Sequence, residues 1–164
     1  MLDPGIRRVR ESDLAAVVGL VHELAEYERV PMAFQLSRRQ LRRALFGPEP
    51  ALFGHVAEVR GTVVGCALWF LNYSTVPELD LKGSLGIYLE DLYVQPEYRG
   101  RGLGRGLLAA LAAESCQRGF SRLEWSVLDW NQTAIGFYEA LGARPTDGCT
   151  TFRLSGAALT ALAR

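Results

Sequence analysis

Apolar residues follow two different periods along this chain, and each change of period marks the boundary of an expected element. Alternation of apolar and polar positions predicts strands, whereas apolar residues three and four positions apart predict helices with one buried face. The predicted strands cover Ile6–Arg10, His55–Val59, Val63–Phe70, Ile87–Val94, Leu123–Leu128 and Thr150–Leu154. The predicted helices cover Leu14–Ala25, Arg38–Leu45, Arg101–Cys116, Asn131–Leu141 and Ala157–Ala163.

Capping residues support several of these helix boundaries. Ser12 stands at an N-cap position before the first helix, and Ser37 with Gln40 three residues later forms a capping box for the second. Gly119 and Gly142 follow the third and fourth helical patterns, where a glycine readily adopts the left-handed conformation that ends a helix. The chain therefore carries local start and stop signals as well as periodicity.

The order of the elements predicts an α/β (α+β mixed) fold, with a central mixed antiparallel and parallel sheet flanked by helices. The Arg60-Gly61 pair between two strand patterns predicts an antiparallel hairpin. The third helix lies between the strands Ile87–Val94 and Leu123–Leu128, and the two strands of such a β-α-β unit are parallel. A change of strand direction of this kind can leave a cleft in the sheet.

Length and composition restrict the class of protein. The 164 residues, 49% hydrophobic and 22% charged, predict a single globular domain over residues 1–164. Eighteen basic residues balance eighteen acidic ones, so neither nucleic acid nor an anionic membrane is an expected partner. Three widely spaced cysteines favour neither a disulfide framework nor a metal site. Without a secretory signal pattern or a long apolar run, a cytoplasmic location is expected.

A glycine-rich segment from Tyr98 to Gly106 follows the strand Ile87–Val94 and leads into the third helix. A helix N-terminus offers unpaired N–H groups, and glycines let a phosphate approach them closely. Taken alone, the segment is equally well explained as a flexible turn. It does not fit the dinucleotide fingerprint, because Arg105 and Leu107 occupy the places expected for its third glycine. It does not fit the nucleotide P-loop either, because no lysine is near.

The spacing Arg99-x-x-Gly102-x-Gly104, after the strand residues 89–94 and a Gln95-Pro96-Glu97-Tyr98 turn, resembles the acyl-CoA signature of the GNAT acetyltransferase superfamily. Segments along most of the chain are similar to the spermidine/spermine N-acetyltransferase branch, which includes acetylases of thialysine and related small amines. These segments are His22–Glu28, Tyr88–Asp91, Trp130-Asn131 and Phe137–Ala143. The resemblance implies acetyl-CoA as co-substrate, a small-molecule amine as acceptor and a homodimer.

The resemblance also implies which residues contact the cofactor. The backbone after the middle of the central strand would face the acetyl and pantetheine portion, the glycine loop would hold the pyrophosphate, and the fourth helix would lie along the pantetheine arm. The implied cofactor-binding residues are Leu92, Tyr93, Val94, Arg99, Gly100, Arg101, Gly102, Leu103, Gly104, Arg105, Asn131, Thr133 and Ala134. Asn131 is explained equally well as an ordinary N-cap.

Acetyl transfer to an amine requires a base, and the departing thiolate requires a proton donor or a hydrogen bond. Glu90 is the candidate base, and the resemblance places Tyr138 beside the thioester sulfur. Side chains alternate along a strand, so Glu90 and Asp91 point to opposite faces unless a bulge intervenes, and the superfamily is known for one near this position. A half-exposed surface carboxylate and a core aromatic are the alternatives for Glu90 and Tyr138.

Acidic and aromatic residues would receive the acceptor. The substrate-binding candidates are Tyr27, Glu28, Glu90 and Asp91, beside Glu23 and Glu26. Solvation on the surface of the first helix explains Glu23 and Glu26 nearly as well. Carboxylates lower the free energy of a bound ammonium, which favours a polyamine, a diamine or a thialysine-like amino acid. Cys149 stands where relatives usually have tryptophan. A non-catalytic acyl-CoA-binding domain and a protein or peptide N-acetyltransferase remain alternative functions.

Overall fold

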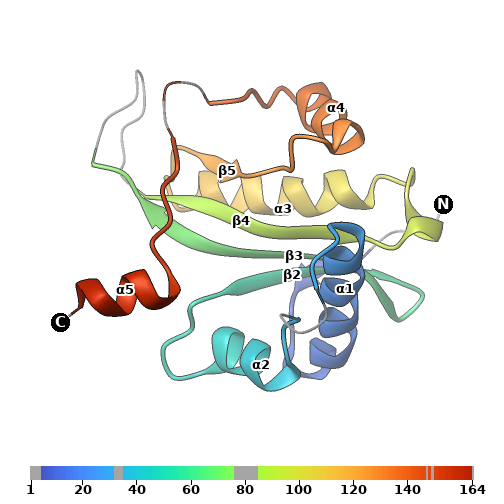
Figure 1. Ribbon diagram of the computed structural model, residues 1–164. Coiled ribbons are helices and arrows are strands. Elements are labelled where there is room, and N and C mark those ends of the chain that lie inside the picture. Colours follow the sequence, from blue (N-terminus) through green and yellow to red (C-terminus); the bar gives the residue numbers. More distant parts are fainter. Residues whose placement is uncertain (1–4, 32–34, 76–84, 147, 149, 164) are drawn as a thin grey trace. The chain divides into compact units, whose positions relative to one another are not determined.

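Five strands form one sheet in the order β1-β2-β3-β4-β5 (Figure 1). The strands are β1 (Gly5–Arg8), β2 (Phe53–Val59), β3 (Thr62–Tyr73), β4 (Leu85–Val94) and β5 (Leu123–Trp125). Each of the first four pairs antiparallel with its neighbour, and β5 pairs parallel with β4. The predicted mixed sheet, antiparallel at first and parallel around the third helix, is therefore confirmed.

The computed structural model describes residues 5–31, 35–75, 85–146, 148 and 150–163. They belong to two compact units, Met1–Ser126 and Val127–Arg164. The first unit contains the sheet and the helices η1 (Glu11–Asp13), α1 (Leu14–Tyr27), α2 (Arg38–Phe46), η3 (Pro96–Tyr98) and α3 (Leu103–Gln117). The second unit contains α4 (Gln132–Ala140) and α5 (Gly156–Leu162).

Helices cover both faces of the sheet, with α1 and α2 on one face and α3 on the other (Figure 1). Leu14, Val17 and Leu20 recur at helical spacing along α1 and are almost completely buried against β2, β3 and α2. Removing an apolar side chain of this size from water contributes about 1.5–3 kcal/mol. On the other face, Leu103 and Leu107 anchor the start of α3. This burial holds the turn between β4 and α3 in place.

Helix α1 starts at Leu14, as the apolar pattern predicted, but Asp13 and not Ser12 holds its N-cap position. The Asp13 carboxylate accepts a hydrogen bond from the Arg10 backbone N–H at 2.7 Å. It also accepts hydrogen bonds from both Nη atoms of Arg7, at 2.7 and 3.0 Å. These bonds hold Ser12 within the short helix η1. In contrast, the capping box of α2 forms as predicted, with the Ser37 hydroxyl accepting the Gln40 N–H at 3.2 Å.

Two strand predictions were wrong in extent or existence. The predicted strand Leu123–Leu128 is only Leu123–Trp125, because β4 supplies hydrogen-bonding partners for those three residues alone. The predicted strand Thr150–Leu154 does not form. The described part of the second unit contains no other strand, so this segment has no partner there and its β-propensity alone is insufficient. Cys149 and the loop residues Pro77 to Gly83 lie outside the described residues.

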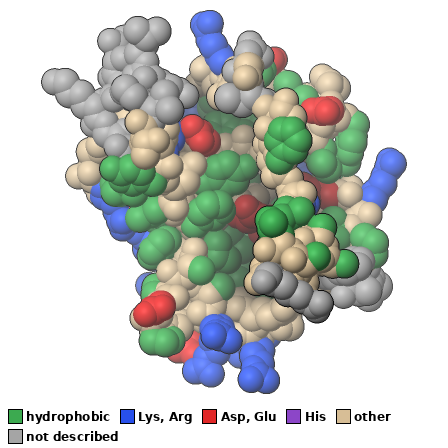
Figure 2. All heavy atoms as spheres, turned by 60° about the vertical axis from the view of Figure 1, so that its left-hand side comes forward, with side chains coloured by type: hydrophobic (Ala, Val, Ile, Leu, Met, Phe, Trp, Pro, Cys, Tyr) green, Lys and Arg blue, Asp and Glu red, His purple; other side chains and the backbone are tan. Residues whose placement is uncertain are grey.

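One face of the molecule shows scattered charges. On the face in Figure 2, outside its grey atoms, basic and acidic side chains stand in separate small groups among apolar and neutral ones. This distribution agrees with the formal net charge of zero. Within the described ranges, every helix is too short or too polar to cross a membrane.

Replacing His55 with glutamine should flatten the dependence of stability on pH between about 4 and 6.5. His55 is buried, and its Nδ1 accepts the Trp69 indole N–H at 3.2 Å. Burial and the nearby Arg8 lower the pKa of His55 to about 4. As the pH falls below 6.5, the unfolded chain takes up a proton that the folded chain does not, so wild-type stability should fall by about 2–3 kcal/mol.

Glutamine can still accept the indole N–H through its amide oxygen but does not titrate. Urea unfolding at pH 7 and near pH 4.5 would measure the difference between the two proteins. If the free energy of unfolding changed with pH equally in wild type and His55→Gln, this result would contradict a neutral, buried His55.

Candidate active site

The glycine loop between β4 and α3 has an open face. Gly100 and Gly102 have φ values of 72° and 81°, which L-residues adopt at a cost of about 1–2 kcal/mol. A Cβ built on either residue would meet no protein atom within 4 Å. Gly102 is also the N-cap of α3, whose first amides have no partner within the helix. The loop therefore fits a phosphate-bearing ligand, because its backbone is exposed where such a group could approach.

The basic side chains of the loop do not all point to one place. Arg99 folds back on β4, where its Nε donates to the Val94 carbonyl at 2.8 Å and its guanidinium lies 5.3 Å from the centre of the Tyr93 ring. Arg101 lies over the Tyr98 ring at 5.5 Å. Arg105 is exposed in the first turn of α3. The three arginines predicted to contact the cofactor thus have different surroundings in this structure.

Strand β4 contains the expected bulge. Asp91 lies opposite Leu68 of β3, but Trp69, the next residue, lies opposite Leu89. Glu90 is therefore the extra residue of β4 at this point. A bulge bends the strand and leaves the extra residue out of the ladder. As a result Glu90 is exposed, while Asp91 shares the α1 face of the sheet with Leu68.

Three of the predicted substrate-binding residues form one electrostatic group. Burial first, then the charges of Glu90 and Glu28, raise the pKa of Asp91 to about 6. Burial and the charge of Glu90 also raise the pKa of Glu28 above its usual range. Like charges held close together disfavour ionisation, and a cation placed among them would relieve this repulsion. The arrangement is suited to binding an ammonium group.

Other acidic residues of α1 have different surroundings. Glu23 accepts a hydrogen bond from the Gln95 side-chain amide at 3.0 Å, so its carboxylate joins α1 to the end of β4. Burial and the nearby Glu23 raise the pKa of Tyr93. The sequence prediction, which set Glu23 beside the substrate-binding candidates, did not include its pairing with Gln95. The sequence carries no signal for it, because Glu23 and Gln95 are 72 positions apart. Tyr27, at the end of α1, is 43% exposed.

The remaining predicted residues lie in the second unit. The Asn131 side chain accepts the Ala134 N–H at 3.2 Å, so Asn131 is the N-cap of α4. Thr133 and Ala134 belong to the first turn of this helix. Tyr138 follows one turn later, with its ring 5.4 Å from that of Phe137. Asn131 and Tyr138 thus lie at the start of and within the same short helix, α4.

The mixed sheet, its bulged central strand and the glycine loop together define an acyltransferase. Residues 19–143 match the model of the Acetyltransferase (GNAT) family. The chain belongs to the GNAT family and is an acetyltransferase.

Relatives and solved structures agree with this assignment. A thialysine N-epsilon-acetyltransferase of Bos taurus is 38% identical over 96% of each chain. A spermidine/spermine N(1)-acetyltransferase-like protein of Homo sapiens is 30% identical over 84% of this chain and 20% of its own length. An integron cassette protein from the mobile metagenome of V. cholerae has a TM-score of 0.79, with 27% identity over 100% of this chain and 99% of its own. The predicted GNAT family and the resemblance to the spermidine/spermine and thialysine N-acetyltransferases are thereby confirmed.

Proposed function

We propose that this acetyltransferase transfers the acetyl group of acetyl-CoA to a primary amine of a small cationic acceptor. The observation that carries the proposal is the group of Glu28, Glu90 and Asp91 beside the bulge of β4. A multiply charged amine can place its ammonium groups among such carboxylates, whereas a neutral acceptor would leave their repulsion unrelieved. The similarity to a thialysine N-epsilon-acetyltransferase supports the same acceptor class.

The co-substrate supplies an acetyl thioester, and the glycine loop supports its binding. Gly100 and Gly102 leave backbone amides accessible for the diphosphate, together with the first turn of α3. The end of β4 would face the pantetheine portion, as would the first turn of α4. The proposed contacts are those of residues 92–94, 99–105, Asn131, Thr133 and Ala134.

Glu90 is the proposed base. An alkylammonium with a pKa of about 10 is almost wholly protonated at neutral pH, so a proton must leave before the nitrogen can attack. Glu90, exposed at the bulge, accepts this proton directly or through water. Glu28 and Asp91, with Tyr27, hold the distal charges of the acceptor. This division lets the reacting nitrogen become neutral while the remaining ammonium groups stay paired.

Tyr138 is proposed to donate a hydrogen bond or a proton to the departing sulfur. A thiol with a pKa near 8.5 is a stronger acid than a phenol near 10, so a hydrogen bond is the less demanding role. The amine attacks the thioester directly within a ternary complex, so the reaction needs no cysteine nucleophile activated by a histidine.

Turnover across a panel of acceptors tests the proposal. Release of free thiol from acetyl-CoA would be followed with spermidine, a diamine, thialysine, ornithine and a peptide with a free N-terminus. Turnover should be fastest with the small di- and polycationic amines. Turnover with the peptide alone would replace the proposal with protein acetylation. A chain that binds acetyl-CoA but has no acceptor-stimulated turnover would instead be a non-catalytic binding domain.

We also propose a homodimer located in the cytoplasm. The dimer follows from the family resemblance, and light scattering should give twice the chain mass of 18.1 kDa. The location agrees with the free thiols of Cys66 and Cys116, which a reducing compartment preserves.

A further inference from the structure

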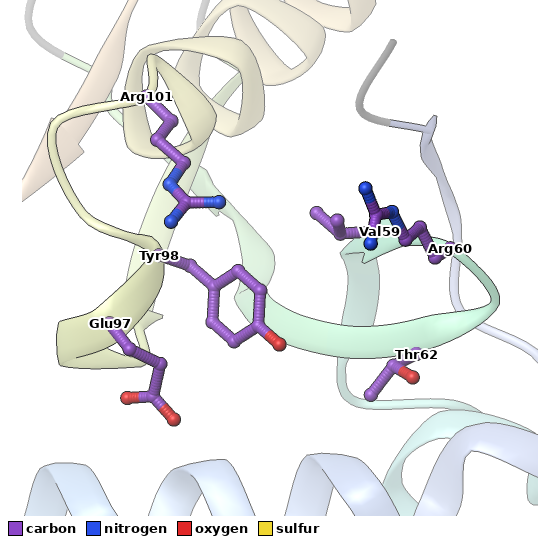
Figure 3. A pocket seen from close by; sticks show the side chains of 6 residues that line it. All are labelled: Val59, Arg60, Thr62, Glu97, Tyr98 and Arg101. Carbon is purple, nitrogen blue, oxygen red and sulfur yellow. The ribbon is translucent and has the colours of Figure 1, made fainter. Parts of the chain in front are cut away.

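A hollow of about 410 Å³ lies between the β2–β3 hairpin and the turn that joins β4 to α3 (Figure 3). The substrate carboxylates and the acceptor chemistry proposed above do not involve it. Its lining residues are Val59, Arg60, Thr62, Glu97, Tyr98 and Arg101. Five of these six side chains carry a group that can form hydrogen bonds, so the hollow is suited to a polar ligand.

Two guanidinium groups face each other across this hollow. Arg60 extends from the hairpin and Arg101 from the opposite side, above the Tyr98 ring (Figure 3). Among the described residues, neither forms an ion pair with a carboxylate. The Glu97 carboxylate points away from both, on the other side of the tyrosine ring (Figure 3). Two like charges are thus held toward one space, where an anion would relieve their repulsion.

The hairpin turn presents Arg60 at a position that the backbone does not favour for it. Val59 pairs with Thr62, so the turn contains only Arg60 and Gly61, with φ values of 52° and 80°. Two-residue turns with positive φ at both positions strongly prefer asparagine, aspartate or glycine at the first. A long basic side chain therefore occupies the turn despite the local backbone preference. Such a departure is expected where the side chain has a role of its own.

We propose that this hollow is a binding site for a phosphate monoester. A monoester dianion matches two guanidinium charges, and its oxygens can accept from both planar donor groups at once. Tyr98 and Thr62 also line the hollow, and each carries a hydroxyl group that can donate a hydrogen bond. A carboxylate would neutralise only one of the two charges. The main-chain amides of Gly100 and Gly102 are not part of this site.

Two sources can supply the phosphate monoester. One is the 3′-phosphate of acetyl-CoA. This alternative rests on the proposed function, in which the same turn holds the diphosphate of the cofactor. The other is a separate phosphorylated metabolite that binds beside the cofactor. The recognition chemistry is the same in both cases, so the experiment must distinguish them.

Calorimetric titration with inorganic phosphate tests the site without any need for catalysis. Replacing Arg60 or Arg101 with glutamine should weaken phosphate binding about tenfold, because each change removes one charge-assisted contact. Arg60→Asn should do the same while favouring the turn, so its effect cannot arise from misfolding. Arg39→Gln, an exposed arginine of α2, is the matched control and should bind like wild type. Absence of saturable binding, or binding unchanged in the Arg60 variants, would overturn the proposal.

Comparison of acetyl-CoA with its 3′-dephospho form then identifies the source. If the cofactor provides the phosphate, its removal should weaken binding about tenfold in wild type and hardly at all in Arg60→Asn. If the ligand is separate, both cofactor forms should bind alike while inorganic phosphate still requires Arg60. A protein without acetyltransferase activity that still binds phosphate through Arg60 would refute the proposed function and retain this site.

Discussion

Replacing Gly102 with valine is expected to weaken acetyl-CoA binding by about a hundredfold or more. The φ of 81° strains any L-residue, and the branched side chain would project from the open face of the loop. Displacing a diphosphate from several backbone N–H groups removes charge-assisted hydrogen bonds. A hundredfold loss of affinity corresponds to about 2.7 kcal/mol of binding free energy. Calorimetric titration with acetyl-CoA would measure the change directly.

Gly119→Val provides a matched control at the other end of the same helix. Gly119 has a φ of 69°, and a Cβ there also meets nothing within 4 Å. The two variants should therefore lose similar stability, about 1–2 kcal/mol each from backbone strain, but only Gly102→Val should lose cofactor affinity. Equal acetyl-CoA affinity of the two variants would remove the glycine loop from the proposed cofactor site, and the acetyl-CoA assignment with it.

Glu90→Gln is expected to lower kcat for amine acetylation by about two to four orders of magnitude. Glutamine has a similar size but cannot accept the proton that an ammonium must lose. The bulge holds Glu90 outside the β3–β4 ladder, so the substitution should not disturb the pairing of these strands. The affinity for acetyl-CoA should stay within about twofold of wild type, because Glu90 lies in the strand before the glycine loop. Steady-state kinetics with the best acceptor of the panel would measure both effects.

Glu49→Gln removes one exposed carboxylate elsewhere on the first unit and should leave kcat unchanged. The rate of Glu90→Gln should also recover as the pH approaches the pKa of the acceptor amine, near 10, because the free amine then needs no base. A kcat for Glu90→Gln within threefold of wild type at neutral pH would exclude Glu90 as the base. Asp91 would then be the next candidate base, since its pKa of about 6 lies closer to neutral pH than that of an ordinary aspartate.

The features predicted correctly from the sequence depend mainly on neighbouring residues. The capping box of Ser37 and Gln40 involves residues three positions apart, and it forms as expected. The turn at Arg60-Gly61 and the glycine loop before α3 are likewise short segments, and the glycines within them marked both in the sequence. Apolar periodicity identified the buried faces of the helices in the same way. Glycine spacing also carried the family resemblance, whereas the order of the elements predicted the fold.

Contacts between distant residues decided the rest. Whether Thr150–Leu154 becomes a strand depends on a hydrogen-bonding partner that its own residues cannot provide. The bulge at Glu90 is set by the register of β4 against β3, and it determines which carboxylate faces α1. The pairing of Glu23 with Gln95 and the convergence of Arg60 with Arg101 join residues far apart in the chain.

The sequence by itself determined the helices and most strands, the loop suited to a diphosphate and the acetyltransferase class, because each rests on local spacing. Only the tertiary structure decided which acidic side chains stand together and which are tied to other groups. It also decided that Arg60 and Arg101 line the same hollow. The physical reason is that charge repulsion, burial and hydrogen bonding act over a few ångströms in space, whatever the distance along the chain.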